Sequence, residues 1–160
     1  MSITEYNDVV YQLSDTLYHY CLMMIKSCPL AEDIVQDCFL SLWQHRRNID
    51  KNKAKNYLIK TAYYNIVNNI RKKNIEQKYL NQTRKTNDIN NYNGVKDAIN
   101  YYLDKLSEFQ KDVLILKDMQ GYSYEEIAKI TGKTLETIKI TIYRARKKLK
   151  ELMVNKENII

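Results

Sequence analysis

Apolar residues recur along the first half of this chain at intervals of three and four, which is the spacing of amphipathic α-helices. The pattern predicts helices over residues 6–25, 30–45 and 55–73, with Pro29 between the first two. Residues 46–56 are polar, basic and irregular, and they are predicted to form a loop. The first half therefore predicts one small helical domain.

The periodicity then fails over an Asn-rich segment, which predicts a flexible linker. Two further helices are predicted between residues 95 and 120, ending before Gly121. The predicted fold is all-α, with two small helical domains joined by the linker. The predicted parts are a first domain over residues 1–74, a linker over 75–94, a second domain over 95–154 and a tail over 155–160.

Residues 123–149 have the pattern of a helix-turn-helix motif. Ser123 and Glu126 have the spacing of a capping box at the start of a short helix, which Gly132 ends. Thr134 is placed to cap a second helix. Its apolar residues form one stripe: Ile138, Ile142, Ala145, Leu149 and Leu152. In such a motif the second helix lies in the DNA major groove.

Positive charge is concentrated on this second helix. Residues 133–150 hold seven Lys or Arg and one Glu, a net +6, whereas the whole chain carries +7. Contact with DNA phosphates requires such a cluster. The charge distribution therefore favours duplex DNA binding over a solvated charged face.

Composition limits the alternatives. Three Gly and one Pro in 160 residues disfavour a turn-rich β protein. The three cysteines have no metal-ligand spacing, which predicts no metal site and suits a reducing cytoplasm. No run approaches eighteen apolar residues, so no membrane span is predicted, and no cofactor is indicated.

Two faces of the first domain are candidates for binding. Asp33, Gln36 and Asp37 share the outer side of the helix over 30–45, where they could dock a basic partner, although spacing alone favours a solvated face. The helix over 55–73 surrounds its apolar stripe with Tyr, Asn, Lys and Arg. That mixture suits single-stranded nucleic acid, because rings stack on bases and cations hold phosphates. Alternatively, some of these tyrosines cap the core.

Both halves resemble a known family. Residues 30–43 (LAEDIVQDCFLSLW) and 56–73 (NYLIKTAYYNIVNNIRKK) resemble region 2 of a bacterial RNA polymerase sigma factor. Residues 106–153, which contain YSYEEIAKITGKTLETIKITIYRARKKL, resemble region 4. The order of the regions, with no domain between them, is similar to the extracytoplasmic-function (ECF) group of the sigma-70 family.

The resemblance implies a role for each candidate residue. It implies that Asp33, Gln36 and Asp37 bind the clamp helices of the largest polymerase subunit. The residues implied to bind and melt the −10 element are Asn48, Lys53, Lys55, Tyr57, Lys60, Tyr63, Tyr64, Asn68 and Arg71. Those implied to bind the −35 element are Thr134, Glu136, Thr137, Lys139, Ile140, Thr141, Tyr143, Arg144 and Lys147.

The implied function is promoter-specific transcription initiation in the cytoplasm, without catalysis. The implied partners are core RNA polymerase, including the flap of its second-largest subunit, promoter DNA, and an anti-sigma factor, which in this family is often membrane-bound. No small-molecule substrate is implied. One alternative is a conventional helix-turn-helix regulator that binds DNA as a dimer without polymerase. A second is an enzyme with Glu32, Asp33 and Asp37 as metal ligands, which the absence of Gly-rich phosphate loops disfavours.

Overall fold

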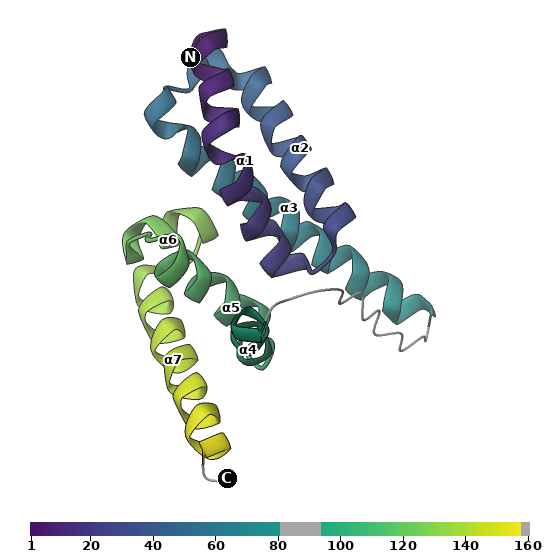
Figure 1. Cartoon of the computed structure of the whole chain (residues 1–160), viewed down its shortest axis with the longest axis vertical. Coiled ribbons are helices and arrows are strands. Elements are labelled where there is room, and N and C mark those ends of the chain that lie inside the picture. Colours follow the sequence, from purple (N-terminus) through teal and green to yellow (C-terminus); the bar gives the residue numbers. More distant parts are fainter. Residues whose placement is uncertain (81–93, 158–160) are drawn as a thin grey trace. The chain divides into compact units, whose positions relative to one another are not determined.

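The structure, a computed structural model, describes residues 1–80 and 94–157, and every regular element within these ranges is helical. The chain divides into two compact units, Met1–Ile89 and Asn90–Ile160 (Figure 1). This confirms the predicted all-α fold with two helical domains. Most of the predicted linker lies outside the described residues.

The first unit is a bundle of three helices in which each helix contacts the other two (Figure 1). Its elements are α1 (Ile3–Ile25), α2 (Cys28–His45), the short 3₁₀ helix η1 (Arg46–Asn48) and α3 (Lys51–Leu80). Its core follows the predicted apolar stripes. The largest fully buried side chains of this core are Leu17, Tyr20, Leu42, Leu58, Ile59 and Ile66.

Capping explains where α1 and α2 begin. The Ser2 hydroxyl accepts a hydrogen bond from the Glu5 amide at 3.1 Å, and the Glu5 carboxylate accepts one from the Ser2 amide at 2.7 Å. This capping box starts α1 three residues before the predicted position. Ser27 caps α2 with a single hydrogen bond, which its hydroxyl accepts from the Leu30 amide at 3.5 Å, and Pro29 lies in the first turn, where its missing amide hydrogen is tolerated.

The predicted boundaries of α3 were wrong at both ends. The helix begins at Lys51, so that Lys53 and Lys55 lie on helix rather than on the predicted loop. It ends at Leu80, seven residues after the predicted end at Lys73. Residues 74–80, which the prediction left out, bury no side chain. Their helical state therefore follows from the intrinsic helix propensity of Lys, Glu, Gln and Leu rather than from a buried apolar stripe.

The second unit contains five successive helical segments (Figure 1). They are α4 (Gly94–Leu103), α5 (Glu108–Leu114), the π-helix η2 (Ile115–Met119), α6 (Tyr124–Thr131) and α7 (Leu135–Glu157). The α7 helix contacts α4, α5 and α6. The central buried side chains are Val113, Ile115, Leu116, Ile127, Ile138 and Ile142.

The helix-turn-helix prediction is confirmed in its details. Ser123 and Glu126 form both hydrogen bonds of the capping box, at 3.1 and 2.8 Å. Gly132 ends α6 at φ 71°, in the left-handed region that favours glycine. The Thr134 hydroxyl accepts a hydrogen bond from the Thr137 amide at 3.2 Å. One correction concerns the C-terminus, because α7 continues to Glu157 through the start of the predicted tail.

In the described ranges, no helix combines the length and the apolar character that a bilayer crossing needs. The three cysteines are free thiols, with Cys21 and Cys38 buried in the first unit and Cys28 exposed. Burial raises the pKa of both buried thiols to about 12. They therefore remain neutral and act as core residues.

Candidate functional site

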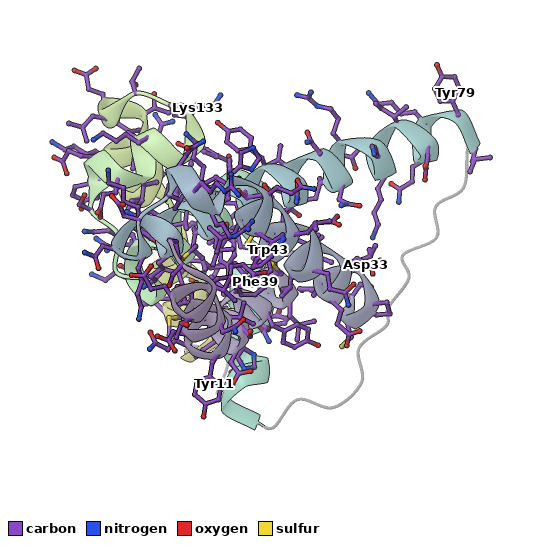
Figure 2. The ribbon with its side chains drawn as sticks, turned by 90° about the horizontal axis from the view of Figure 1, so that it is seen from above. Tyr11, Asp33, Phe39, Trp43, Tyr79 and Lys133 are labelled. Carbon is purple, nitrogen blue, oxygen red and sulfur yellow. The ribbon has the colours of Figure 1, made fainter. Side chains whose placement is uncertain are left out.

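An acidic ridge lies on the solvent side of α2. Asp33, Gln36 and Asp37 are exposed and follow one another at the helical spacing of three and four residues. The opposite side of the helix buries Ile34 and Cys38 in the core. Figure 2 shows Asp33 on the outside of the helix, away from Phe39 and Trp43. The structure thus brings together all three predicted polymerase-binding residues.

One member of this ridge was missed by the sequence analysis. Leu40 lies seven residues after Asp33, on the same side of α2, and its side chain is 54% exposed. An exposed Leu that follows two carboxylates along one helix side is an apolar anchor beside charged groups, as protein interfaces have. The available signal was that Leu40 does not fit the buried stripe of α2. We refer to Asp33, Gln36, Asp37 and Leu40 as the α2 ridge.

A second face lies on α3, on the side away from the buried Ala62 and Ile66. It carries aromatic, amide and cationic side chains spaced at three, four, four and three residues, so they form one stripe. Most of them are exposed, and the first is half-buried. We refer to Tyr57, Lys60, Tyr64, Asn68 and Arg71 as the α3 stripe.

Tyr57 is held in place by α2. Its hydroxyl lies 2.6 Å from the Ser41 hydroxyl and 3.2 Å from Nδ1 of His45. That His45 nitrogen is also 2.8 Å from the Ser41 carbonyl oxygen. These contacts fix the ring at the start of the stripe, beside η1. A fixed aromatic ring is a better stacking platform than a mobile one, because less side-chain entropy is lost on binding.

The structure does not support Tyr63 as a contact with DNA. Its side chain is only 6% exposed and belongs to the core of the first unit. The ring meets its exposed neighbour Tyr64 edge to face, with centroids 5.7 Å apart. Tyr63 follows Ile59 by four residues and precedes Ile66 by three, so the core spacing already contained this signal. The alternative that some tyrosines cap the core is correct for this residue.

The connection between α2 and α3 is tied down at several points. The Arg46 guanidinium lies 3.8 Å from the centre of the Trp43 ring, and the N-terminal ammonium donates a hydrogen bond to the Arg46 carbonyl at 2.9 Å. Asn48 is exposed at the end of η1. Lys53 and Lys55 are exposed on the first turns of α3. These three predicted residues therefore lie on a rigid corner rather than on a free loop.

The predicted −35 residues gather on the solvent side of α7. Their opposite side buries Ile138, Ile142 and Ala145. Thr141 is half-buried and donates a hydrogen bond to the Thr137 carbonyl at 2.6 Å, so its hydroxyl is engaged within the helix. The exposed members, which we call the α7 face, are Thr134, Glu136, Thr137, Lys139, Ile140, Tyr143, Arg144 and Lys147.

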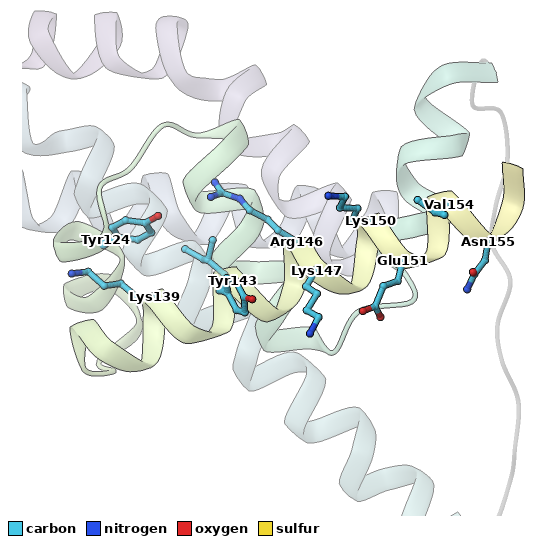
Figure 3. Close-up of a pocket in the computed structure, with 10 residues that line it drawn as sticks. Tyr124, Lys139, Tyr143, Arg146, Lys147, Lys150, Glu151, Val154 and Asn155 are labelled. Carbon is cyan, nitrogen blue, oxygen red and sulfur yellow. The ribbon is translucent and has the colours of Figure 1, made fainter. Parts of the chain in front are cut away.

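A groove of about 760 Å³ runs along one flank of the α7 face (Figure 3). Tyr124 of α6 lines it together with residues of α7. Four of the lining side chains are cations and one, Glu151, is an anion. The cations are Lys139, Arg146, Lys147 and Lys150. Because Arg146 is paired with Asp118, three cations remain against Glu151, and this flank suits a negatively charged backbone.

Arg146 is turned toward the protein, unlike its neighbour Arg144. Both Nε and Nη2 of Arg146 donate to the Asp118 carboxylate of η2, at 3.4 and 2.5 Å. This fork fixes α7 against the π-helix, and the hydrogen bonds that Arg146 donates to Asp118 raise the pKa of the Arg146 guanidinium. Arg146 is thus a positioning residue for the α7 face.

Family comparison agrees with this geometry. The model described as "Sigma-70 region 2" matches residues 9–75, and the model described as "Sigma-70, region 4" matches residues 96–149. The first match contains the α2 ridge and the α3 stripe, and the second contains the helix-turn-helix. The chain belongs to the ECF group of the sigma-70 family.

Individual relatives agree with this membership. The ECF RNA polymerase sigma factor SigM of Bacillus subtilis (strain 168) is 26% identical over 153 residues, spanning 91% of this chain and 93% of the relative. The ECF RNA polymerase sigma factor SigW of the same organism is 24% identical over 161 residues, spanning 90% and 86%.

Solved structures share the fold. The Bartonella quintana sigma factor RpoE, in complex with the anti-sigma factor NepR, matches with a TM-score of 0.81 at 24% identity, over 94% of this chain and 98% of that one. CnrH, in complex with the cytosolic domain of CnrY, matches with a TM-score of 0.68 at 19% identity, over 94% and 88%.

This sigma factor directs promoter-specific initiation by RNA polymerase and is not an enzyme. The alternative in which Glu32, Asp33 and Asp37 hold a catalytic metal is therefore wrong. The alternative of a dimeric regulator that acts without polymerase is wrong as well.

The second unit of the sigma factor also holds one buried carboxylate. Asp112 of α5 is 3% exposed, and its Oδ1 has no hydrogen-bond partner among the described residues. The pKa of Asp112 is raised to about 7, chiefly by burial and secondarily by the nearby Glu108, while Lys111 partly offsets both. Asp112 therefore titrates close to physiological pH. Its side chain lies in the core of the second unit rather than on the α7 face.

Proposed function

We propose that the sigma factor divides its work among three surfaces: the α2 ridge binds polymerase, the α3 stripe binds the −10 element, and the α7 face binds the −35 element. The observation that carries this proposal is the opposite chemistry of the two faces of the first unit. Carboxylates and an exposed Leu lie on α2, whereas cations and tyrosines lie on α3. A protein partner and a nucleic acid therefore have separate places to bind.

The α2 ridge fits a basic, partly apolar helical surface. Asp33 and Asp37 supply two carboxylates one helical turn apart. Leu40, three residues after Asp37, supplies an apolar contact on the same side of α2. We assign this ridge to the clamp helices of the largest polymerase subunit. Because charges at an interface rim mainly set partner choice and association rate, Leu40 supplies much of the affinity.

The α3 stripe fits the unpaired non-template strand of the −10 element. Tyr57 and Tyr64 offer ring faces for bases, Asn68 offers an amide for a base edge, and Lys60 and Arg71 offer cations for phosphates. Lys53, four residues before Tyr57, extends the cationic surface on the same side of α3, and Asn48 adds an amide at the corner. Lys55 lies on the other side of α3, beside Leu13 and Leu17 of α1, and can reach DNA only from there. Trapping unpaired bases on this surface favours strand opening, because stacking offsets lost base pairing.

The α7 face fits the major groove of the −35 element. Glu136, Ile140 and Arg144 are exposed on its central line, where they can reach base edges. Lys139 and Lys147 line the flanking groove, where they can hold phosphates (Figure 3). Base recognition and backbone contact are thus assigned to different parts of one helix.

Further partners follow from this function. We assign the second unit to the flap of the second-largest polymerase subunit as well as to DNA. Two structural relatives were solved with NepR, an anti-sigma factor, and with the cytosolic domain of CnrY, and they support an anti-sigma factor as a partner of this chain, including one of the membrane-bound kind. Since the sigma factor itself acts with polymerase on the chromosome, we place its action in the cytoplasm.

A charge reversal on α2 tests the assignment of the ridge. Asp37→Arg should weaken binding to core polymerase by about tenfold or more, because a cation would face a basic partner. Glu32→Arg makes the same charge change at an exposed position to the side of the ridge, and it should have little effect. Binding is measured by fluorescence anisotropy of the labelled full-length protein titrated with core enzyme.

Equal loss in both variants would show a general charge effect and would remove the ridge from the interface. Unchanged binding by Asp37→Arg would contradict the assignment directly. Far-UV circular dichroism of each variant checks that α2 remains folded.

A further inference from the structure

The first two turns of α7 leave few side chains available for contact with bases. In a helix-turn-helix motif, the N-terminal residues of the second helix meet the base edges. The Thr134 and Thr137 hydroxyls lie 2.7 Å apart and bond to each other, and the Thr141 hydroxyl donates to the Thr137 carbonyl at 2.6 Å. The three threonines of this segment are therefore engaged within the start of the helix.

Glu136 and Ile140, which lie one helical turn apart on the α7 face, are not engaged in this way. The Ile140 side chain is 49% exposed. The Glu136 side chain is exposed, and it forms no ion pair or hydrogen bond with any part of the chain that the structure describes. Lys139 lines the flanking groove, where it is assigned to phosphate. Glu136 and Ile140 are thus the first side chains of α7 available for base recognition.

Glu136 differs in charge from the rest of its segment. It is the one acid among residues 133–150, which hold seven cations. A carboxylate only accepts hydrogen bonds, and it repels phosphates, so it weakens DNA binding unless a base donates to it. The major groove offers two such donors, the amino groups of cytosine and adenine, but adenine has its N7 acceptor beside the amino group. Cytosine is therefore the base that Glu136 suits best.

Ile140 suits a different feature of the major groove. An exposed Ile gains most by leaving water against another apolar group, and the C5-methyl of thymine is the apolar group in the major groove. Glu136 and Ile140 are four residues apart, which is about 6 Å of helix, whereas successive base pairs are about 3.4 Å apart. The two bases should therefore lie within about two base pairs of each other.

We propose that Glu136 and Ile140 are specificity-determining residues for a cytosine and a neighbouring thymine in the −35 element. Glu136 accepts a hydrogen bond from the cytosine amino group, and Ile140 contacts the thymine methyl group. The proposal rests on the assignment of the α7 face to the −35 element, and it adds which base features that face selects. Lys139 and Lys147 then hold the backbone of any sequence, whereas Glu136 and Ile140 discriminate between sequences.

A structural role for Glu136 makes a different prediction. A carboxylate in the first turn stabilises a helix through its dipole, and Glu136 occupies such a position in α7, as Glu125 does in α6. Glu125→Gln removes the same charge from the same kind of position, so it is the matched control. A structural role predicts similar results for Glu125→Gln and Glu136→Gln, whereas base recognition predicts that only Glu136→Gln changes the preferred base.

The test is promoter selection by transcription from a randomised library, with full-length protein and core polymerase. The proteins are the native chain, Glu136→Gln, Ile140→Ser and the control Glu125→Gln. Because Gln pairs with adenine through two hydrogen bonds, Glu136→Gln should change one cytosine of the upstream motif to adenine. Ile140→Ser should lose the preference for one thymine within about two base pairs of that cytosine. The control should select the native motif.

Titration of each holoenzyme with defined duplexes then measures the size of each effect. Replacing the selected cytosine by adenine, with its pairing partner, should weaken native binding about five- to thirtyfold, and Glu136→Gln should prefer the adenine duplex. Replacing the selected thymine by deoxyuridine removes only the methyl group. That change should weaken native binding about two- to fourfold and binding by Ile140→Ser less than about 1.5-fold.

An upstream motif that lacks this cytosine and thymine, or one that Glu136→Gln leaves unchanged, would overturn the inference while preserving the assignment of α7 to the −35 element. An equal effect of deoxyuridine on the native protein and on Ile140→Ser would overturn it as well. The absence of any shared upstream motif among the native transcripts would instead contradict the proposed function, and the inference with it.

Discussion

At the scale of single residues, one helical step separates a buried tyrosine from the exposed tyrosine that we assign to the −10 element. Tyr63 is 6% exposed and Tyr64 is 44% exposed, although they are adjacent on α3. Tyr63 belongs to the core with Ile59 and Ile66, whereas Tyr64 lies on the α3 stripe. The two positions therefore form a natural pair for separating stability from promoter opening.

Alanine at each position should have a different effect. Tyr63→Ala should lower the free energy of unfolding by about 3–5 kcal/mol, because it leaves a cavity. Tyr64→Ala should leave stability within about 0.5 kcal/mol and should reduce open-complex formation by about tenfold, since one stacking contact is lost. Chemical denaturation and permanganate footprinting of the −10 element measure the two quantities. Normal promoter opening by Tyr64→Ala would remove this residue from the −10 surface.

Asp112 gives a second prediction at the residue scale. In the unfolded chain its pKa is near 3.8, and burial raises the pKa to about 7 in the fold. Between these values the folded state holds a proton that the unfolded state releases, so stability falls as pH rises from about 4 to 7. Above pH 7 the full penalty remains, on the order of 2–4 kcal/mol.

Asp112→Asn should therefore stabilise the second unit at pH 8 and have little effect at pH 4. Glu125→Gln, which removes one exposed carboxylate from the same unit, is the control and should be neutral at both values. Thermal unfolding followed by circular dichroism measures the difference. A stabilisation that is equal at both pH values would show that titration of Asp112 is not its cause.

At the scale of elements, α7 depends on its contact with η2. Arg144 lies on the α7 face, and Arg146, two residues later, is bound to Asp118 of the π-helix. Lys147, beside Arg146, is assigned to a phosphate, so Lys147→Ala should weaken promoter binding and reduce the salt dependence of log Kd by about one. Arg146→Ala should instead reduce stability and bind promoter with a nearly unchanged salt dependence. Filter binding at several salt concentrations checks both results, and identical salt dependence in the two variants would contradict the division.

Element positions were largely predictable from sequence, because buried stripes and caps have fixed spacings. The helix-turn-helix is the clearest case, since Ser123, Glu126 and Gly132 specify its start and turn by local hydrogen bonding and backbone conformation. The α3 boundaries were not predictable in this way. Residues 71–80 bury nothing, so no periodicity shows that the helix continues. The π-helix η2 was not anticipated either, since no sequence pattern marks it.

The candidate surfaces were predicted less completely than the elements. The charges of the α2 ridge were visible as a spacing of carboxylates and an amide, but Leu40 was overlooked because an apolar residue in a helix is usually assigned to the core. Tyr63 was assigned to DNA although it is buried, because a tyrosine on this helix was taken as a surface residue. Fourteen tyrosines make an aromatic residue a weak signal for nucleic-acid binding in this chain. Side-chain exposure resolves both cases.

At the scale of the whole molecule, the proposed function depends on joining two weak DNA contacts. The α3 stripe and the α7 face belong to different units, and each offers few side chains to DNA. Binding both units to one polymerase converts the second contact into an intramolecular event, which raises its effective concentration. The sigma factor should therefore gain promoter specificity through polymerase rather than alone.

The most direct test of this account is run-off transcription from a randomised promoter library, with bacterial core polymerase in the presence and absence of this protein. The account predicts transcripts that require the protein and whose templates share two sequence motifs at a fixed spacing. Those transcripts should disappear with Asp37→Arg and persist with Glu32→Arg. Protein-dependent transcripts whose templates share only one motif, or no protein-dependent transcripts at all, would contradict the division of promoter recognition between the two units.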